Sequence, residues 1–244
     1  IGMVKVAERL SFVQLREVVT RFGFGVRTGI GLPGETPGLV TPQRAWTKHT
    51  QTSIAMGYEV GVTPVQMVRA FSAFARSGPM AGTLPELRLT AVSERDIRTN
   101  VATRVLPEDV VALARDAMGD VAHNMETRWA KPPDGGSWRY DLFGKSGTAK
   151  IAAVAPPGKR RPRWFGGYFE KQYNSSFIAA GPTESPRIVV LVVIDDPGPE
   201  RVRTRSYYGS AVAGPVVRRV MERGLSYLGI TPTVPEPATI AQVD

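Results

Sequence analysis

Residues 175–194 read SSFIAAGPTESPRIVVLVVI, and this stretch decides the fold class. Residues 187–194 form a run of β-branched and aliphatic side chains, which predicts a strand covered on both faces. Residues 175–181 predict a second strand just before it. Only residues 182–186 connect the two, and a parallel crossover needs about a dozen residues, so we predict an antiparallel pair.

Helical periodicity governs most of the remaining chain. The segments that show it are residues 1–22, 64–77, 107–121 and 210–228. Thr63, Pro64 and Gln66 form a capping-box pattern that starts the second helix, and Ser11 marks a break within the first. Short strands are expected around residues 87–92. The order of helices, strands and a closing helix predicts an α+β fold, with a mostly antiparallel sheet flanked by helices.

Two details of this prediction concern the C-terminal end. In the closing helix, Pro215 is expected to start or kink the helix. The residues expected to face the core are Val216, Val217, Val220, Leu225 and Leu228. Residues 229–244 contain three prolines and are expected to form an extended tail.

Composition excludes several classes of protein and site. The 244 residues are 42% hydrophobic and 22% charged, enough apolar material for a core. There is no cysteine, which excludes disulfides, thiolate metal sites and cysteine nucleophiles. Two histidines, His49 and His123, are too few for a His-rich metal centre. No apolar run reaches about 18 residues, so no membrane span is predicted, and we expect neither a cofactor nor a metal.

The chain carries a net charge of +9, with 31 basic and 22 acidic residues, which favours anionic partners. The densest basic cluster comprises Lys159, Arg160, Arg161 and Arg163, and the aromatic residues Trp164 and Phe165 follow it directly. Basic residues beside aromatic ones can bind single-stranded nucleic acid, with a steep dependence on salt. Pro156, Pro157, Gly158 and Pro162 break any regular helix or strand around this cluster. We therefore prefer its interpretation as a solvated loop.

The segment with the most chemical information is Lys145-Ser146-Gly147-Thr148, within a strand predicted over residues 140–151. Side chains alternate along a strand, so Lys145 and Gly147 share one face and the two hydroxyls share the other. At a sheet edge all four residues could still border one groove, where an extended peptide pairs with the free backbone groups. Lys145 supplies a charge for a carboxylate, and the Thr148 N–H could serve an oxyanion hole. The alternative is an ordinary strand with a bulge at Gly147.

The context of this segment resembles the transpeptidase domain of class B, high-molecular-weight penicillin-binding proteins. Lys145-Ser146-Gly147 matches the third signature of that family, K-T-G, with serine in place of threonine. Further matching segments are residues 53–67 (SIAMGYEVGVTPVQM), 188–197 (IVVLVVIDDP), 207–209 (YYG) and 213–216 (AGPV). The resemblance covers most of the chain and identifies residues 1–228 as the C-terminal portion of such a domain.

The resemblance implies a peptidoglycan D,D-transpeptidase that cross-links the cell wall in division or shape maintenance and is a target of β-lactams. Lys145 and Thr148 would be catalytic, and all of Lys145, Ser146, Gly147 and Thr148 would bind substrate. The implied partners are the D-Ala-D-Ala end of stem peptides, β-lactams, the N-terminal half of the domain and other cell-wall synthesis proteins. The intact protein would act at the extracytoplasmic face of the bacterial inner membrane.

One departure from the family pattern changes this expectation. No serine in the chain is followed by lysine three positions later, and no S-x-N sequence occurs. We expect the chain to begin just after the second signature, so that the nucleophilic serine lies outside it and the chain alone is inactive. The alternative is a non-catalytic peptidoglycan-binding or division-scaffold module with the same fold. The two signatures in the upstream coding sequence would favour the enzyme.

Overall fold

The computed structural model describes residues 2–90, 102–133, 135–153 and 167–234. The chain divides into two compact units, residues 1–111 and 112–244. Nothing in the sequence marked this division, which falls within helix α6 (Glu108–Trp129). The basic cluster at 159–165 lies outside the described residues, so its interpretation as a loop stays a prediction.

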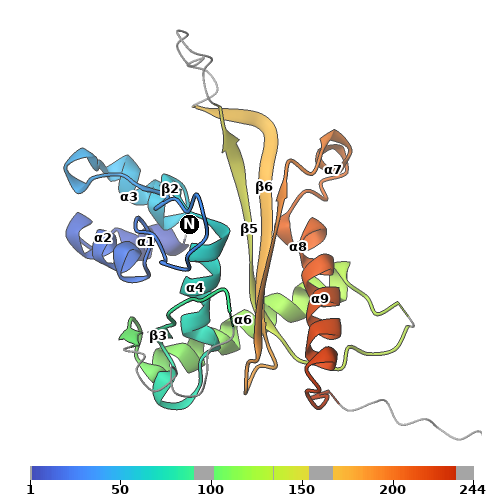
Figure 1. Cartoon of the computed structure of the whole chain (residues 1–244). Coiled ribbons are helices and arrows are strands. Elements are labelled where there is room, and N and C mark those ends of the chain that lie inside the picture. The colour runs from blue at the N-terminus through green and yellow to red at the C-terminus, as the bar shows by residue number, and fades with distance from the viewer. Residues whose placement is uncertain (1, 91–101, 134, 154–166, 235–244) are drawn as a thin grey trace, which may run out of the picture. The chain divides into compact units, whose positions relative to one another are not determined.

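Unit 1 is built from short helices and two-stranded ribbons. Its elements are α1 (Gly2–Ala7), α2 (Phe12–Arg21), β1 (Leu39–Val40), η1 (Gln43–Ala45), α3 (Lys48–Ala55), β2 (Val60–Gly61), α4 (Pro64–Ala75), η2 (Gly78–Met80), β3 (Thr83–Leu84) and β4 (Thr103–Arg104). Ser11 separates α1 from α2, and Thr63 caps α4 through a capping box with Gln66, both as predicted (Figure 1). The structure adds that Ser11 also caps α2. Residues 87–90 form no strand, so that part of the prediction is wrong.

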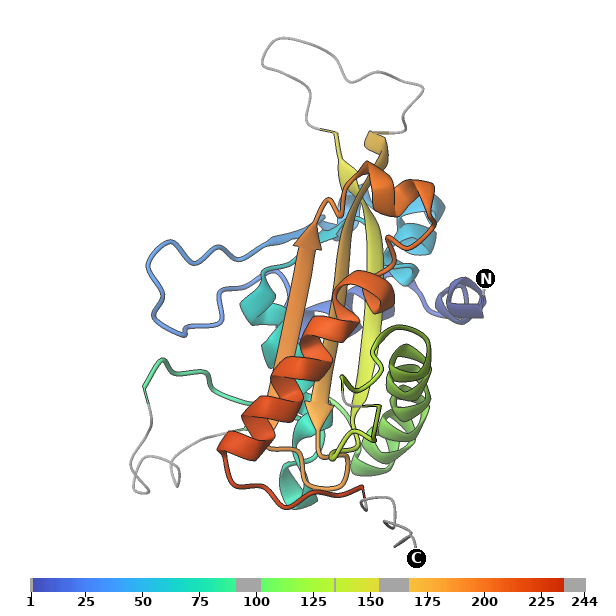
Figure 2. The ribbon, with the colours of Figure 1, turned by 90° about the vertical axis from the view of Figure 1, so that its right-hand side faces the viewer.

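Unit 2 carries the predicted sheet. Its elements after α6 are β5 (Phe143–Ala152), β6 (Tyr168–Gly181), β7 (Ile188–Asp195), α7 (Pro199–Arg203), α8 (Gly209–Val212) and α9 (Gly214–Tyr227). The strands pair antiparallel in the order β5-β6-β7, which confirms the α+β class. Strand β6 begins seven residues earlier than predicted. The prediction missed this part because residues 168–174 are mostly polar and show no strand periodicity. Figure 2 shows α9 lying across one face of this sheet.

Helix α9 packs on the sheet through a narrower face than its sequence indicated. Pro215 starts the helix, as one of the two predicted possibilities. The fully buried apolar side chains are then Val217, Met221 and Leu225, four residues apart, which pack in one cluster with Phe177 of β6. By contrast, three residues expected in the core are exposed: Val216 (37%) and Val220 (46%) on α9, and Leu228 (50%) just after it.

Strand β7 is also less covered than its apolar run predicted. None of its residues is fully buried, and Val193 is 46% exposed. Among the described residues, β7 pairs with β6 alone, so it forms one edge of the sheet. The continuous β-branched run therefore predicted the strand correctly, but the prediction that both faces of the strand are covered was too strong.

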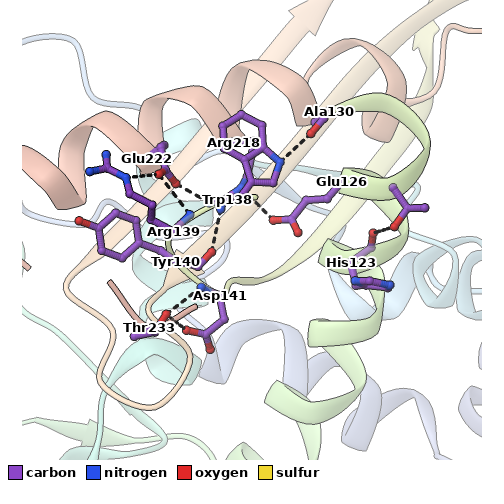
Figure 3. A network of polar contacts seen from close by, with 11 residues as sticks. His123, Glu126, Ala130, Trp138, Arg139, Tyr140, Asp141, Arg218, Glu222 and Thr233 are labelled. Atoms are coloured by element: carbon purple, nitrogen blue, oxygen red, sulfur yellow. Dashed lines mark hydrogen bonds and ion pairs between the residues drawn. The ribbon is translucent and has the colours of Figure 1, made fainter. Parts of the chain in front are cut away.

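A buried ion network joins α6, α9 and the chain that enters β5 (Figure 3). Arg218 of α9 is fully buried, and its guanidinium lies 2.9 Å from Glu126 and 3.3 Å from Glu222. It also donates a hydrogen bond of 2.7 Å to the Tyr140 carbonyl and stacks 4.6 Å from the ring centre of Trp138. Burial lowers the pKa of Arg218 and raises the pKa of Glu126, although each opposes the other's shift. The network fixes the entry to β5 because it bonds the strand's leading backbone to two helices.

The first part of the predicted tail packs on the same entry segment. The Thr233 hydroxyl bonds the carboxylate of Asp141, and the Thr233 and Val234 amides donate to the Arg139 carbonyl at 2.9 and 3.0 Å. The expected tail is thus anchored as far as Val234. Residues 235–244 lie outside the described part of the chain.

Asp141 makes the stability of unit 2 sensitive to acid. Burial alone would raise its pKa, but hydrogen bonds from Thr183 and Thr233 lower it below the usual value. Asp141 is therefore expected to stabilise the folded state at neutral pH and to lose this contribution as the pH falls below about 4. Asp141→Asn should unfold more easily at neutral pH and show a flatter decline in acid, measured by thermal denaturation. Asp120→Asn, an exposed change on α6, is the control, and parallel profiles for Asp141→Asn and the parent chain would contradict this assignment.

Candidate functional site

The predicted site residues all lie on β5, at the second edge of the described sheet. Strand β5 pairs with β6 and with no other described strand. Its register places Lys145 opposite Ile178, Gly147 opposite Ser176 and Thr148 opposite Ser175. The backbone groups on the free side of β5 are therefore open to an incoming extended chain.

The two faces of β5 separate the cation from the hydroxyls, as strand alternation predicted. Ser146 pairs with Phe177, whose ring lies in the core beneath α9, so the Ser146 side chain is on that face. Thr148 shares this face, and Lys145 is on the other. Lys145 is exposed, and its ammonium donates a 2.8 Å hydrogen bond to the Ser146 carbonyl. The Lys145 ammonium therefore lies against the backbone of β5, next to the residues that carry the hydroxyls.

The start of α8 holds the Thr148 side chain in place. The Gly209 amide donates a 3.0 Å hydrogen bond to the Thr148 hydroxyl oxygen, so the proton of that hydroxyl remains available as a donor. Gly209 lies so close to the sheet that a Cβ there would be 2.0 Å from the Ser176 carbonyl oxygen and 2.4 Å from that of Gly147. Only glycine permits this approach, which explains the residue type in the YYG segment.

A stack of three tyrosines lies next to this contact and was not identified from the sequence. The Tyr207 ring stacks on Tyr173 of β6 at 4.3 Å and on Tyr208 at 4.4 Å. The Ser175 hydroxyl donates a 2.5 Å hydrogen bond to the Tyr207 carbonyl and ties the stack to β6. The hydrogen bond with Tyr207 raises the pKa of Tyr208. The adjacent tyrosines were visible in the sequence, but their contact with Tyr173 depends on the fold.

Comparisons with known proteins agree with this geometry. The family described as "Penicillin binding protein transpeptidase domain" matches residues 1–222. The chain belongs to that family. It is 29% identical over 243 residues to "Probable peptidoglycan D,D-transpeptidase PenA" of Neisseria meningitidis, covering 100% of this chain and 37% of PenA. It is 30% identical over 237 residues to "Peptidoglycan D,D-transpeptidase FtsI" of Escherichia coli, covering 95% of this chain and 35% of FtsI.

Solved structures show the same transpeptidase fold. The apo structure of the TP domain from Burkholderia pseudomallei penicillin-binding protein 3 matches with a TM-score of 0.73 and 26% identity. That match covers 96% of this chain and 63% of the Burkholderia chain. The class B resemblance is confirmed by these relatives. The chain spans about a third of the length of the curated penicillin-binding proteins it matches.

No described helix combines the length and the apolar character that crossing a bilayer requires. The described residues also contain no group of three or more His, Cys, Asp or Glu side chains that could hold a metal ion.

Proposed function

We propose that this chain is the C-terminal part of a peptidoglycan D,D-transpeptidase and that its β5 edge binds the D-Ala-D-Ala end of a stem peptide. The observation that carries the proposal is the Lys145-Ser146-Gly147-Thr148 signature on an open strand edge, in a chain of this family. A peptide can pair with the free edge, and Gly147 has no side chain to obstruct it. The intact protein is proposed to act at the extracytoplasmic face of the inner membrane, with other cell-wall synthesis proteins.

In the proposed reaction, a serine outside this chain attacks the carbonyl carbon between the two D-Ala residues. The serine oxygen forms the acyl bond, the terminal D-Ala leaves with a proton, and an amine of a second stem peptide takes the acyl group. The Thr148 N–H would donate to the oxyanion of each tetrahedral intermediate, beside the N–H of the nucleophile. β-Lactams would acylate the same serine.

The side chains of β5 have separate proposed roles. Lys145 would neutralise the terminal carboxylate of the peptide and support proton transfer. Ser146 and the free hydroxyl proton of Thr148 would donate to the same carboxylate. Since Lys145 and the hydroxyls are on opposite faces, a carboxylate reaches both only at the strand edge, which is where an added peptide strand would lie.

Covalent labelling by a fluorescent penicillin tests this proposal. The 244-residue chain alone should remain unlabelled, and a protein that also contains the upstream part of the domain should be labelled. In that longer protein, Lys145→Ala should slow labelling at least about tenfold, since a hydrogen bond to a charged group is lost. Lys150→Ala, an exposed change on the same strand, should label normally.

The absence of S-x-x-K and S-x-N keeps a second function open, a non-catalytic peptidoglycan-binding or division-scaffold module. It predicts that the longer protein stays unlabelled yet sediments with purified peptidoglycan. Labelling of the longer protein that is unaffected by Lys145→Ala would overturn the role proposed for β5. Labelling of the 244-residue chain alone would show that it contains a nucleophile.

A further inference from the structure

Unit 2 contains a cavity of about 600 Å³ between the end of α6 and the chain that enters β5. Trp138, Tyr140 and Leu142 line its apolar part, and Tyr140 and Leu142 are almost fully buried. Two carboxylates also line it, Glu126 from α6 and Asp141 from the entry segment. Both residues are labelled in Figure 3. Its volume and its mixture of aromatic and polar walls are typical of small-molecule sites.

Among the described residues, the Asp141 carboxylate forms no direct ion pair, although its charge acts on the nearby Arg218 guanidinium and opposes the fall in the pKa of Arg218. Its oxygens accept from the Thr233 hydroxyl and from the Thr183 amide at 3.2 Å, and both donors are neutral. These bonds lower its pKa, so it is ionised at neutral pH. A half-buried carboxylate held by neutral donors attracts a mobile cation more strongly than one that already forms an ion pair.

The charged side chains of the buried network beside the cavity also include more carboxylates than cations. Three carboxylates, those of Glu126, Glu222 and Asp141, face two guanidinium groups, those of Arg218 and Arg139. The carbonyls at the C-terminal end of α6 add negative potential beside the cavity, because a helix ends with its negative pole.

Two further side chains line the mouth of the cavity. His123 and Lys131 are both exposed, and His123 opposes the rise in the pKa of Glu126. The Lys131 ammonium is therefore hydrated, and its charge is largely screened from the cavity wall. The Lys131 ammonium therefore does not serve as an ion-pair partner for the Asp141 carboxylate.

We propose that this cavity binds a small organic cation, a primary ammonium group on a flat apolar body, with the ammonium placed between Asp141 and Glu126. The apolar body packs against Trp138 and Leu142, and the ammonium donates to the two carboxylates. The site is separate from the β5 edge and does not depend on the proposed transpeptidase activity.

Phenethylamine and its neutral isostere 2-phenylethanol are suitable probes, used with the 244-residue chain. The Trp138 indole N–H, which donates a 2.7 Å hydrogen bond to the Ala130 carbonyl, provides an NMR signal at the cavity wall. Trp138→Phe identifies that signal by removing it. Phenethylamine should shift the signal saturably and bind at least about tenfold more tightly than 2-phenylethanol, which lacks the charge.

Substitutions on two different walls test where the ammonium lies. Asp141→Asn and Glu126→Gln should each weaken phenethylamine binding several-fold, whereas Asp120→Asn, on α6 outside the cavity, should not. Retained dispersion of the amide spectrum shows that each variant is folded, and Glu126→Gln serves if Asp141→Asn loosens the entry segment. Equal binding of the amine and the alcohol, no saturable shift, or unchanged affinity in both folded variants would overturn the proposal.

Discussion

Arg218→Met is expected to lower the free energy of unfolding of unit 2 by about 3–5 kcal/mol, the range seen when one partner of a buried ion pair is removed. Methionine keeps most of the apolar volume, so the loss is mainly electrostatic. Glu126 and Glu222 would keep their charges in a buried site without the guanidinium between them. The Tyr140 carbonyl would also lose its 2.7 Å hydrogen bond, which loosens the entry to β5.

Urea denaturation followed by circular dichroism measures this effect. Arg219→Met removes the same charge from the next residue of α9, which is exposed, and should change stability by no more than about 0.5 kcal/mol. Burial already raises the pKa of Glu126, and loss of Arg218 should raise it further. The variant's deficit should therefore shrink as the pH falls toward that raised value, because the neutral acid needs no partner. Equal stability of the Arg218 and Arg219 variants would contradict a structural role for the network.

Gly209→Ala should be the most damaging of the single-methyl insertions near β5. The added Cβ would lie 2.0 Å from the Ser176 carbonyl oxygen and 2.4 Å from that of Gly147, so α8 must move away from the sheet. Overpacking of this kind costs about 1–3 kcal/mol, and more where the backbone cannot yield. The shift should also break the bond from the Gly209 amide to Thr148, which positions the proposed carboxylate donor.

Gly119→Ala is the matched control for this prediction. Gly119 lies inside α6, and apart from its neighbours in the chain and the backbone of its own helix no heavy atom lies within 4 Å of the Cβ it would gain. The substitution should raise stability by about 0.5–1 kcal/mol, because alanine loses less backbone entropy in a helix than glycine. Thermal denaturation of both variants gives the comparison. A Gly209 variant as stable as the parent chain would show that α8 tolerates separation from the sheet, and the position of Thr148 would then need another explanation.

Local patterns in the sequence were sufficient for much of the fold. The β-branched run of β7 and the short connection that precedes it predicted an antiparallel pair, since both depend on short-range chain geometry. The capping box at Thr63 was also predicted, because it is a contact among four neighbouring residues. The Lys145–Thr148 segment and the family were identified from residue types and order.

The tertiary structure decided features that depend on distant residues. The polar start of β6 is a strand because β5 pairs with it, and the outward position of Val220 follows from how α9 meets the sheet. Arg218 and Glu222 lie one turn apart on α9, but Glu126 comes from α6, about ninety residues earlier, and no local pattern joins it to them. The sequence by itself determined which chemical groups the chain carries and which short segments become strands or helices, because those properties arise between neighbouring residues. Only the folded chain decided that Gly209 contacts Thr148 and that Asp141 forms no direct ion pair with another described residue, because both depend on which distant segments pack together.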